Sequence, residues 1–145
     1  MSDLSGILSG TFIYDDLEIA VSGLLSSEFN LTSGQILTEN EVPDIDEILF
    51  TRMIWTYGTL EDVSNNCDQE IPNLNIEIYE RKNSGQNYIS SLVRKLRYVI
   101  KENINVKNSN GSYVKINEVY ITRNTNDPEW NAFTLTVSFR IIKAR

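Results

Sequence analysis

The sequence contains no histidine, the residue that most often serves as a general base or a metal ligand in proteins. Without histidine, neither a Ser-His-Asp nor a Cys-His catalytic arrangement can form within this chain. Zinc sites of the Cys/His type are excluded for the same reason. No other nucleophile stands beside a recognisable base. We therefore expect a protein that is not an enzyme, with no cofactor and no catalytic or metal site.

Cysteine and long apolar runs are also scarce. The single cysteine, Cys67, has no partner for an internal disulfide, so we expect a reducing compartment. The first residues, MSDLSGILSGTFIYDD, lack a basic region and carry Asp3, which is unlike a secretory signal. No apolar run approaches the ~18 residues of a membrane span, so we expect no membrane contact.

The composition is that of an ordinary globular domain. The chain has 145 residues, of which 41% are hydrophobic and 23% are charged. This length is sufficient for one domain with a real core, whereas two halves would each be too small. We expect a single domain over residues 1–145, with allowance for a flexible arm at 1–13.

Hydrophobic spacing predicts two helices and four strands. The first helix covers 14–29, and the second begins after Asn83 or Ser84, whose side chains can cap it. The predicted strands are 48–57, 74–82, 114–121 and 133–142, with loops at 30–47 and 58–72. This order predicts an α+β fold, with a mostly antiparallel four-stranded sheet and both helices packed on one face.

Three of these segments have apolar faces that can be named in advance. The second helix has a stripe at helical spacing, and the second and fourth strands alternate. The predicted core positions are Ile89, Leu92, Val93, Leu96, Val99 and Ile100 in the helix; Leu74, Ile76, Ile78 and Glu80 in the second strand; and Phe133, Leu135, Val137, Phe139 and Ile141 in the fourth.

Charge is distributed unevenly along a chain whose net charge is −7. Residues 1–51 contain ten acids and neither lysine nor arginine, whereas residues 81–101 contain six basic residues and no acid. The six are Arg81, Lys82, Arg94, Lys95, Arg97 and Lys101. Three interpretations are open: an ordinary solvated face, a nucleic-acid face, or a contact with an acidic patch on a protein. Separated patches of opposite sign suit a head-to-tail contact between copies, which can close into a ring.

Two further features are candidate contact sites. Asp44, Asp46 and Glu47 form an acidic cluster that suits a solvated loop, a protein contact or a cation site, although its spacing is not that of an EF-hand. Trp130 lies in a polar turn and is a candidate exposed contact residue, whereas Trp55 is expected in the core.

The order of elements resembles that of the tail terminator (tail completion) proteins of long-tailed bacteriophages and phage-tail-like particles. The resemblance covers roughly residues 14–142. It rests on the first helix, the strand-to-helix junction IEIYERKNSGQN–YISSLVRKLRYVIKEN, and the closing strand FTLTVSFRII.

The resemblance implies a non-catalytic virion protein, assembled in the cytoplasm of a host bacterium. It implies a hexameric ring that caps the tail tube, ends its polymerisation and joins the tail to the neck. The implied partners are copies of the chain, the tail tube protein, a neck or connector protein and, in contractile tails, the sheath. DNA only passes through the lumen.

In that setting we expect the basic residues, the acidic cluster and Trp130 to lie in subunit or partner interfaces. We expect the hairpins 58–72 and 123–132 to reach the neighbouring ring. Two alternatives stay open. One is another small neck, connector or minor tail protein, such as a head-closure protein. The other is a nucleic-acid-associated module that uses the basic helix.

Overall fold

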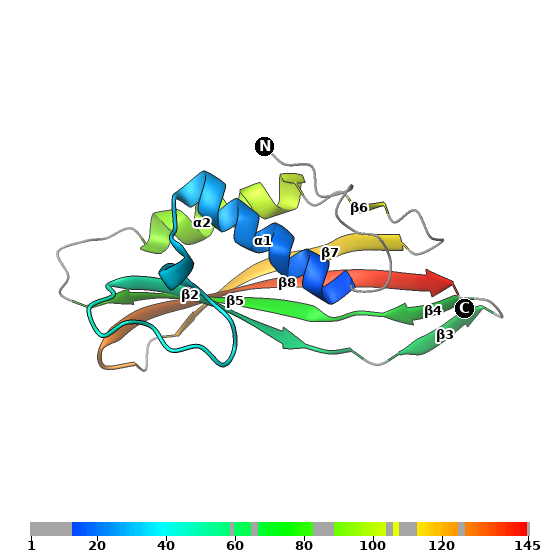
Figure 1. The fold of residues 1–145 in the computed structure, drawn as a ribbon. Helices are drawn as coiled ribbons and strands as arrows, with labels where there is room; N and C mark the ends of the chain where they lie inside the picture. Colours follow the sequence, from blue (N-terminus) through cyan, green and yellow to red (C-terminus); the bar gives the residue numbers. More distant parts are fainter. Residues whose placement is uncertain are drawn as a thin grey trace.

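Figure 1 shows a computed structural model of the chain, which describes residues 13–58, 60–64, 67–82, 89–103, 106–107, 113–124 and 127–144. Within these residues the two α-helices are α1 (Ile13–Phe29) and α2 (Ile89–Asn103). Both lie on the same face of one sheet, which confirms the predicted α+β class. The capping positions proposed for the second helix and residues 1–12 of the predicted arm lie outside the described residues.

The sheet is larger than the four strands that the sequence predicted. In the described part of the chain it has eight strands: β1 (Ile36–Leu37), β2 (Leu49–Thr56), β3 (Glu61–Ser64), β4 (Cys67–Glu70), β5 (Asn73–Arg81), β6 (Val106–Lys107), β7 (Tyr113–Asn124) and β8 (Trp130–Ala144). The long β8 lies at the centre. It pairs with β5 and β4 along one side and with β7 along the other. All pairs are antiparallel except β1 with β2.

The segment 58–72, predicted as a polar loop and as a hairpin, contains two strands that were not predicted. β2 and β3 run outward and β4 and β5 return, so that the segment forms the outer part of one long hairpin. The hairpin is interrupted where Gly58 meets Ile71: a Cβ added to Gly58 would lie 2.5 Å from the Ile71 carbonyl oxygen. The polar sequence of β3 and β4 hid this strand pair, because it lacks the apolar alternation typical of a half-buried strand.

The prediction that 30–47 is entirely loop was also wrong in part. A short 3₁₀-helix (Ser33–Gln35) leads directly into β1. The Thr51 hydroxyl donates a hydrogen bond to the Gln35 carbonyl at 3.0 Å and holds this segment against β2. A strand of two residues is too short to leave a periodic signal in the sequence.

The hydrophobic core fills the space between the helices and the sheet. All six predicted positions of α2 are buried, as are Leu74, Ile76, Ile78 and Glu80 of β5. On β8, Leu135, Val137, Phe139 and Ile141 are buried and Phe133 packs against the core. These three predicted faces are therefore confirmed. Each fully buried Leu or Ile contributes about 1.5–3 kcal/mol relative to an exposed one.

A cluster of aromatic and acidic side chains fixes α1 on the sheet. The Tyr14 hydroxyl donates a hydrogen bond to the Glu70 carboxylate of β4, and the Trp55 indole nitrogen donates to Glu18 at 2.6 Å. The Tyr14 and Trp55 rings meet edge to face at 4.8 Å. Trp55 packs against the core, as predicted. Burial, followed by the effect of Glu70, raises the pKa of Tyr14 above its ordinary value.

The opposite face of the sheet is more polar, and its side chains bond to one another. Across β2, β5 and β8, the Asn75 amide donates to the Thr56 hydroxyl and the Thr136 hydroxyl donates to Asn75, both at 3.0 Å. No described helix combines the length and the apolar character that crossing a bilayer requires.

Candidate functional site

The four basic residues of α2 are exposed, but they diverge around the helix. Lys95 turns toward α1, where its ammonium lies 5.6 Å from the centre of the Phe29 ring. Arg97 and Lys101 instead line a hollow beside β7, and Arg94 does not line it. The basic helix therefore presents two flanks of different surroundings, and the β7 flank is the one that forms a concave surface.

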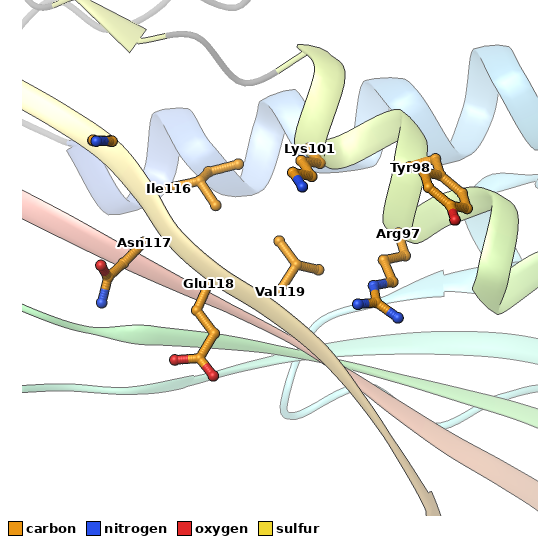
Figure 2. Close-up of a pocket in the computed structure, with 8 residues that line it drawn as sticks. Arg97, Tyr98, Lys101, Ile116, Asn117, Glu118 and Val119 are labelled. Atoms are coloured by element: carbon orange, nitrogen blue, oxygen red, sulfur yellow. The ribbon is translucent and has the colours of Figure 1, made fainter.

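This concave surface, called here the α2–β7 groove, has a volume of about 480 Å³. Its lining consists of Arg97, Tyr98 and Lys101 from α2 and residues 115–119 from β7. Figure 2 shows that Ile116 and Val119 point toward the helix, whereas Asn117 and Glu118 point away from it. The groove thus has an apolar floor, formed by Ile116 and Val119, beside the polar side chains of α2.

A β-bulge in β7 produces this arrangement. Ile116 pairs with Phe139 and Glu118 with Ser138, so Asn117 is an extra residue with no partner in the register. The extra residue places both Ile116 and Val119 on the core side, although strict alternation would separate them. Bulges occur frequently at sheet edges and beside functional sites.

The β7 flank of the groove is also an edge of the sheet. β6 pairs only with Tyr113 and Val114. In the described part of the chain, no strand pairs with the outer side of β7 from Lys115 to Arg123. Unpaired backbone groups on a strand edge are a ready site for contact with another chain.

The charge of the groove is predominantly positive. Arg97, Lys101 and Lys115 are exposed around it, and Glu118 is its single acid. Tyr98 lines the groove next to Arg97, with 66% of its surface exposed. A concave surface with an excess of cations attracts carboxylates or phosphates.

Arg81 and Lys82 lie apart from the basic helix and are engaged within the molecule. The Arg81 guanidinium lies 4.4 Å from the centre of the Trp130 ring and donates to the Ile45 carbonyl at 3.3 Å. The Lys82 ammonium donates to the Asp127 carbonyl at 2.8 Å. These two residues join the ends of β5 and β8 to neighbouring loops, and the structure does not bring them into one cluster with α2.

Trp130 is half buried rather than exposed. Its ring meets Phe50 edge to face at 5.0 Å, and Phe50 in turn stacks on Tyr79 at 4.7 Å. The antiparallel register brings these aromatic residues together on the sheet face opposite the helices. Burial, followed by the charge of Glu77, raises the pKa of Tyr79.

The acidic cluster lies in the loop between β1 and β2, whose residues 39–47 are called here the acidic loop. Asp44 and Asp46 are exposed, and the half-buried Glu47 accepts a hydrogen bond from the Gln35 amide at 3.1 Å. Hydrogen bonds from the Thr38 backbone and hydroxyl lower the pKa of Glu41. Among the described residues, no group of three or more His, Cys, Asp or Glu side chains is placed to hold a metal ion.

The acidic loop is held at its base but exposes two apolar side chains. Arg52 donates to the Glu41 carbonyl at 3.1 Å, and Arg81 donates to the Ile45 carbonyl. Val42 is nevertheless 82% exposed and Ile45 88% exposed. Both side chains are therefore accessible to another molecule.

Sequence reasoning found the acidic loop and the basic helix but missed the groove. The β7 wall depends on the bulge at Asn117, which leaves no distinctive pattern in the sequence VKINEVY. The apolar side chains of the acidic loop could have been found from the sequence. Val42 and Ile45 are two β-branched apolar residues among five acids in ENEVPDIDE, a pattern that indicates exposed apolar side chains.

Comparisons with known proteins give a fold but no function. No protein-family model and no curated protein matches this chain. One similar solved structure, of a protein whose name carries no functional description, is 11% identical with a TM-score of 0.61. It covers 88% of this chain and 94% of that chain. At this identity the likeness shows a shared fold alone.

Proposed function

We propose that this chain is a non-catalytic ring subunit that caps the tail tube of a phage or phage-tail-like particle and ends its polymerisation. The order of elements and the strand-to-helix junction support the resemblance to tail terminators from which this proposal comes. A hexamer and a virion location follow from the same resemblance.

The observation that carries the proposal is the separation of opposite charges across the sheet. The acidic loop connects β1 with β2 at one side of the sheet, whereas the α2–β7 groove lies at the other side, beyond β5 and β8. Two different surfaces on opposite sides of one subunit suit a head-to-tail contact. Repetition of such a contact closes into a ring when the rotation between subunits allows it.

The outer hairpin offers a second contact surface, along the tail axis. In Figure 1, β3 and β4 extend past the two helices together with the end of β8. We assign this extension to contact with the tail tube protein or the neck or connector protein. In contractile tails the sheath is a further neighbour of the ring.

The test uses the purified chain alone and mixed with the tail tube protein encoded by the same particle. Mass photometry and negative-stain electron microscopy are expected to show a hexameric ring, free or at one end of each tube. A chain that stays monomeric in solution and does not bind tube ends would overturn the proposal.

A second candidate function has one observation in its favour. Arg97, Lys101 and Lys115 line the same groove as the exposed Tyr98, and cations near an exposed aromatic ring are a feature of sites that bind single-stranded nucleic acid. With so few cations on an acidic protein, such binding would be weak and sensitive to salt. Filter binding at low salt, repeated with Arg97→Glu, distinguishes this candidate from the ring.

A further inference from the structure

We propose that the α2–β7 groove receives the acidic loop of a second copy of this chain. This inference rests on the proposed ring and names the two surfaces that join one subunit to the next. We identify the acidic loop as the occupant of the groove because the loop and the groove have opposite charges and both expose apolar side chains.

The acidic loop has features of a segment that enters a groove on another subunit. Val42 and Ile45 are three residues apart and extend into solvent from a backbone that Arg52 and Arg81 hold from below. The backbone bond from the Glu47 amide to the Asp44 carbonyl, at 3.0 Å, closes a turn around Ile45. A loop already ordered in the free subunit loses little conformational entropy when it binds.

The groove has the form of a receptor for such a segment. Its volume of about 480 Å³ is comparable with the roughly 300–1,000 Å³ of pockets that hold small molecules. Ile116 and Val119 provide an apolar floor that is continuous with the core. Such a floor suits β-branched side chains better than it suits a phosphate group.

Charge around the two surfaces is complementary. In the loop, Glu41, Asp44 and Asp46 are exposed beside Val42 and Ile45. In the groove, the exposed cations Arg97, Lys101 and Lys115 stand beside the apolar floor. Apolar contact at the centre supplies affinity, and the surrounding pairs of opposite charge supply register and faster association.

The topology makes this contact intermolecular. The loop enters β2, which is separated from β7 by β5 and β8, so the two surfaces lie on opposite sides of the sheet. One copy therefore keeps a free loop on one side and a free groove on the other. Each added copy repeats the contact in the same sense, which is the geometry that a ring requires.

A charge-exchange experiment on the full chain tests the contact directly. The groove variant carries Arg97→Glu with Lys101→Glu, and the loop variant carries Asp44→Lys with Asp46→Lys. All four side chains are exposed, so both variants are expected to fold, and circular dichroism checks this. Sedimentation velocity at low salt, with and without the tail tube protein, measures association.

We expect each variant alone to self-associate at least about tenfold more weakly than the wild type, because each reversed side chain then faces charges of its own sign across the contact. An equimolar mixture should recover association, because the reversed groove of one variant meets the reversed positions 44 and 46 of the other, and the unchanged groove meets the unchanged loop. The matched control, Arg123→Glu, reverses an exposed charge of β7 outside the groove and should self-associate as the wild type does.

The outcomes separate this inference from the proposed ring. If the wild type forms rings and the groove variant forms them equally well, or if the mixture does not recover, the groove assignment is wrong and the ring stands. If neither the wild type nor the mixture associates, alone or on tubes, both proposals fail. If groove reversal abolishes binding of single-stranded DNA but leaves self-association unchanged, the groove belongs to nucleic acid and the inference is overturned.

Discussion

At the scale of single residues, two glycines differ in whether the structure has room for a larger side chain. At Gly58 a Cβ would lie 2.5 Å from the Ile71 carbonyl oxygen, so backbone must move to admit it. At Gly23, in the middle of α1, a Cβ would meet nothing within 4 Å. The first glycine permits the close approach of the two strands where the long hairpin is interrupted, and the second only weakens a helix.

We predict that Gly58→Ala lowers the free energy of unfolding by about 1–3 kcal/mol, the usual cost of forcing extra atoms into a packed site. Gly23→Ala is the matched control and should raise it by about 0.5–1 kcal/mol, because alanine favours the helix. Urea denaturation measures both changes. Equal effects at the two positions would contradict the close contact between Gly58 and Ile71.

Tyr14 gives the protein a predicted sensitivity to high pH. Because its pKa is raised in the folded state, Tyr14 ionises first in the unfolded chain as pH rises past the ordinary tyrosine value of about 10. Its contribution to stability is therefore fully present below about pH 10 and declines above it.

The variant Tyr14→Phe should lose about 1 kcal/mol of stability at pH 8, because the hydrogen bond to Glu70 is removed. Its stability should then fall less steeply than that of the wild type between about pH 10 and 11. Urea denaturation at a series of pH values measures the difference. Parallel curves for the two proteins would show that Tyr14 titrates normally.

At the scale of elements, α2 has two faces with different roles. Leu96 is fully buried in the core, whereas Tyr98 is exposed on the groove side. We predict that Leu96→Ala costs about 2–5 kcal/mol of stability, the usual range for a buried leucine. Tyr98→Ala should change stability by less than about 0.5 kcal/mol but weaken self-association. Thermal denaturation and sedimentation velocity, applied to both variants, separate the two roles.

The elements that the sequence predicted are those with their own apolar periodicity. The stripe from Ile89 to Ile100 and the alternation in β5 and β8 place these segments without any tertiary information. β3 and β4 escaped prediction because β8 extends beyond β5 and supplies their pairing partner. The groove escaped because it needs a bulge in one strand and the flank of a distant helix. Fold class could thus be predicted, but strand number and the site could not.

For the basic segment 81–101, too, adjacency in the sequence did not predict which side chains lie together in space. Its residues are adjacent in sequence, yet Arg81 and Lys82 are engaged by Trp130, Ile45 and Asp127. Lys95 lies toward Phe29, on a different flank of α2 from the groove. The roles of these residues in an interface stay predictions.

At the scale of the whole molecule, assembly should depend strongly on salt. The groove and the acidic loop meet through exposed charges, whose interaction range falls from about 10 Å at 0.1 M salt to about 3 Å at 1 M. We therefore predict that rings formed in 50 mM salt dissociate when salt is raised to 1 M, as measured by mass photometry. Assembly that is insensitive to salt would indicate a contact dominated by other surfaces.

The proposed activity of the whole molecule is to stop growth of the tail tube, so tail length is its most direct readout. The measurement is electron microscopy of particles produced with and without the gene for this chain. We predict that its loss yields tubes of variable, excessive length that lack a terminal ring, and that the wild-type chain restores uniform length. Tails of normal length that join normally to heads, in the absence of the chain, would contradict the account.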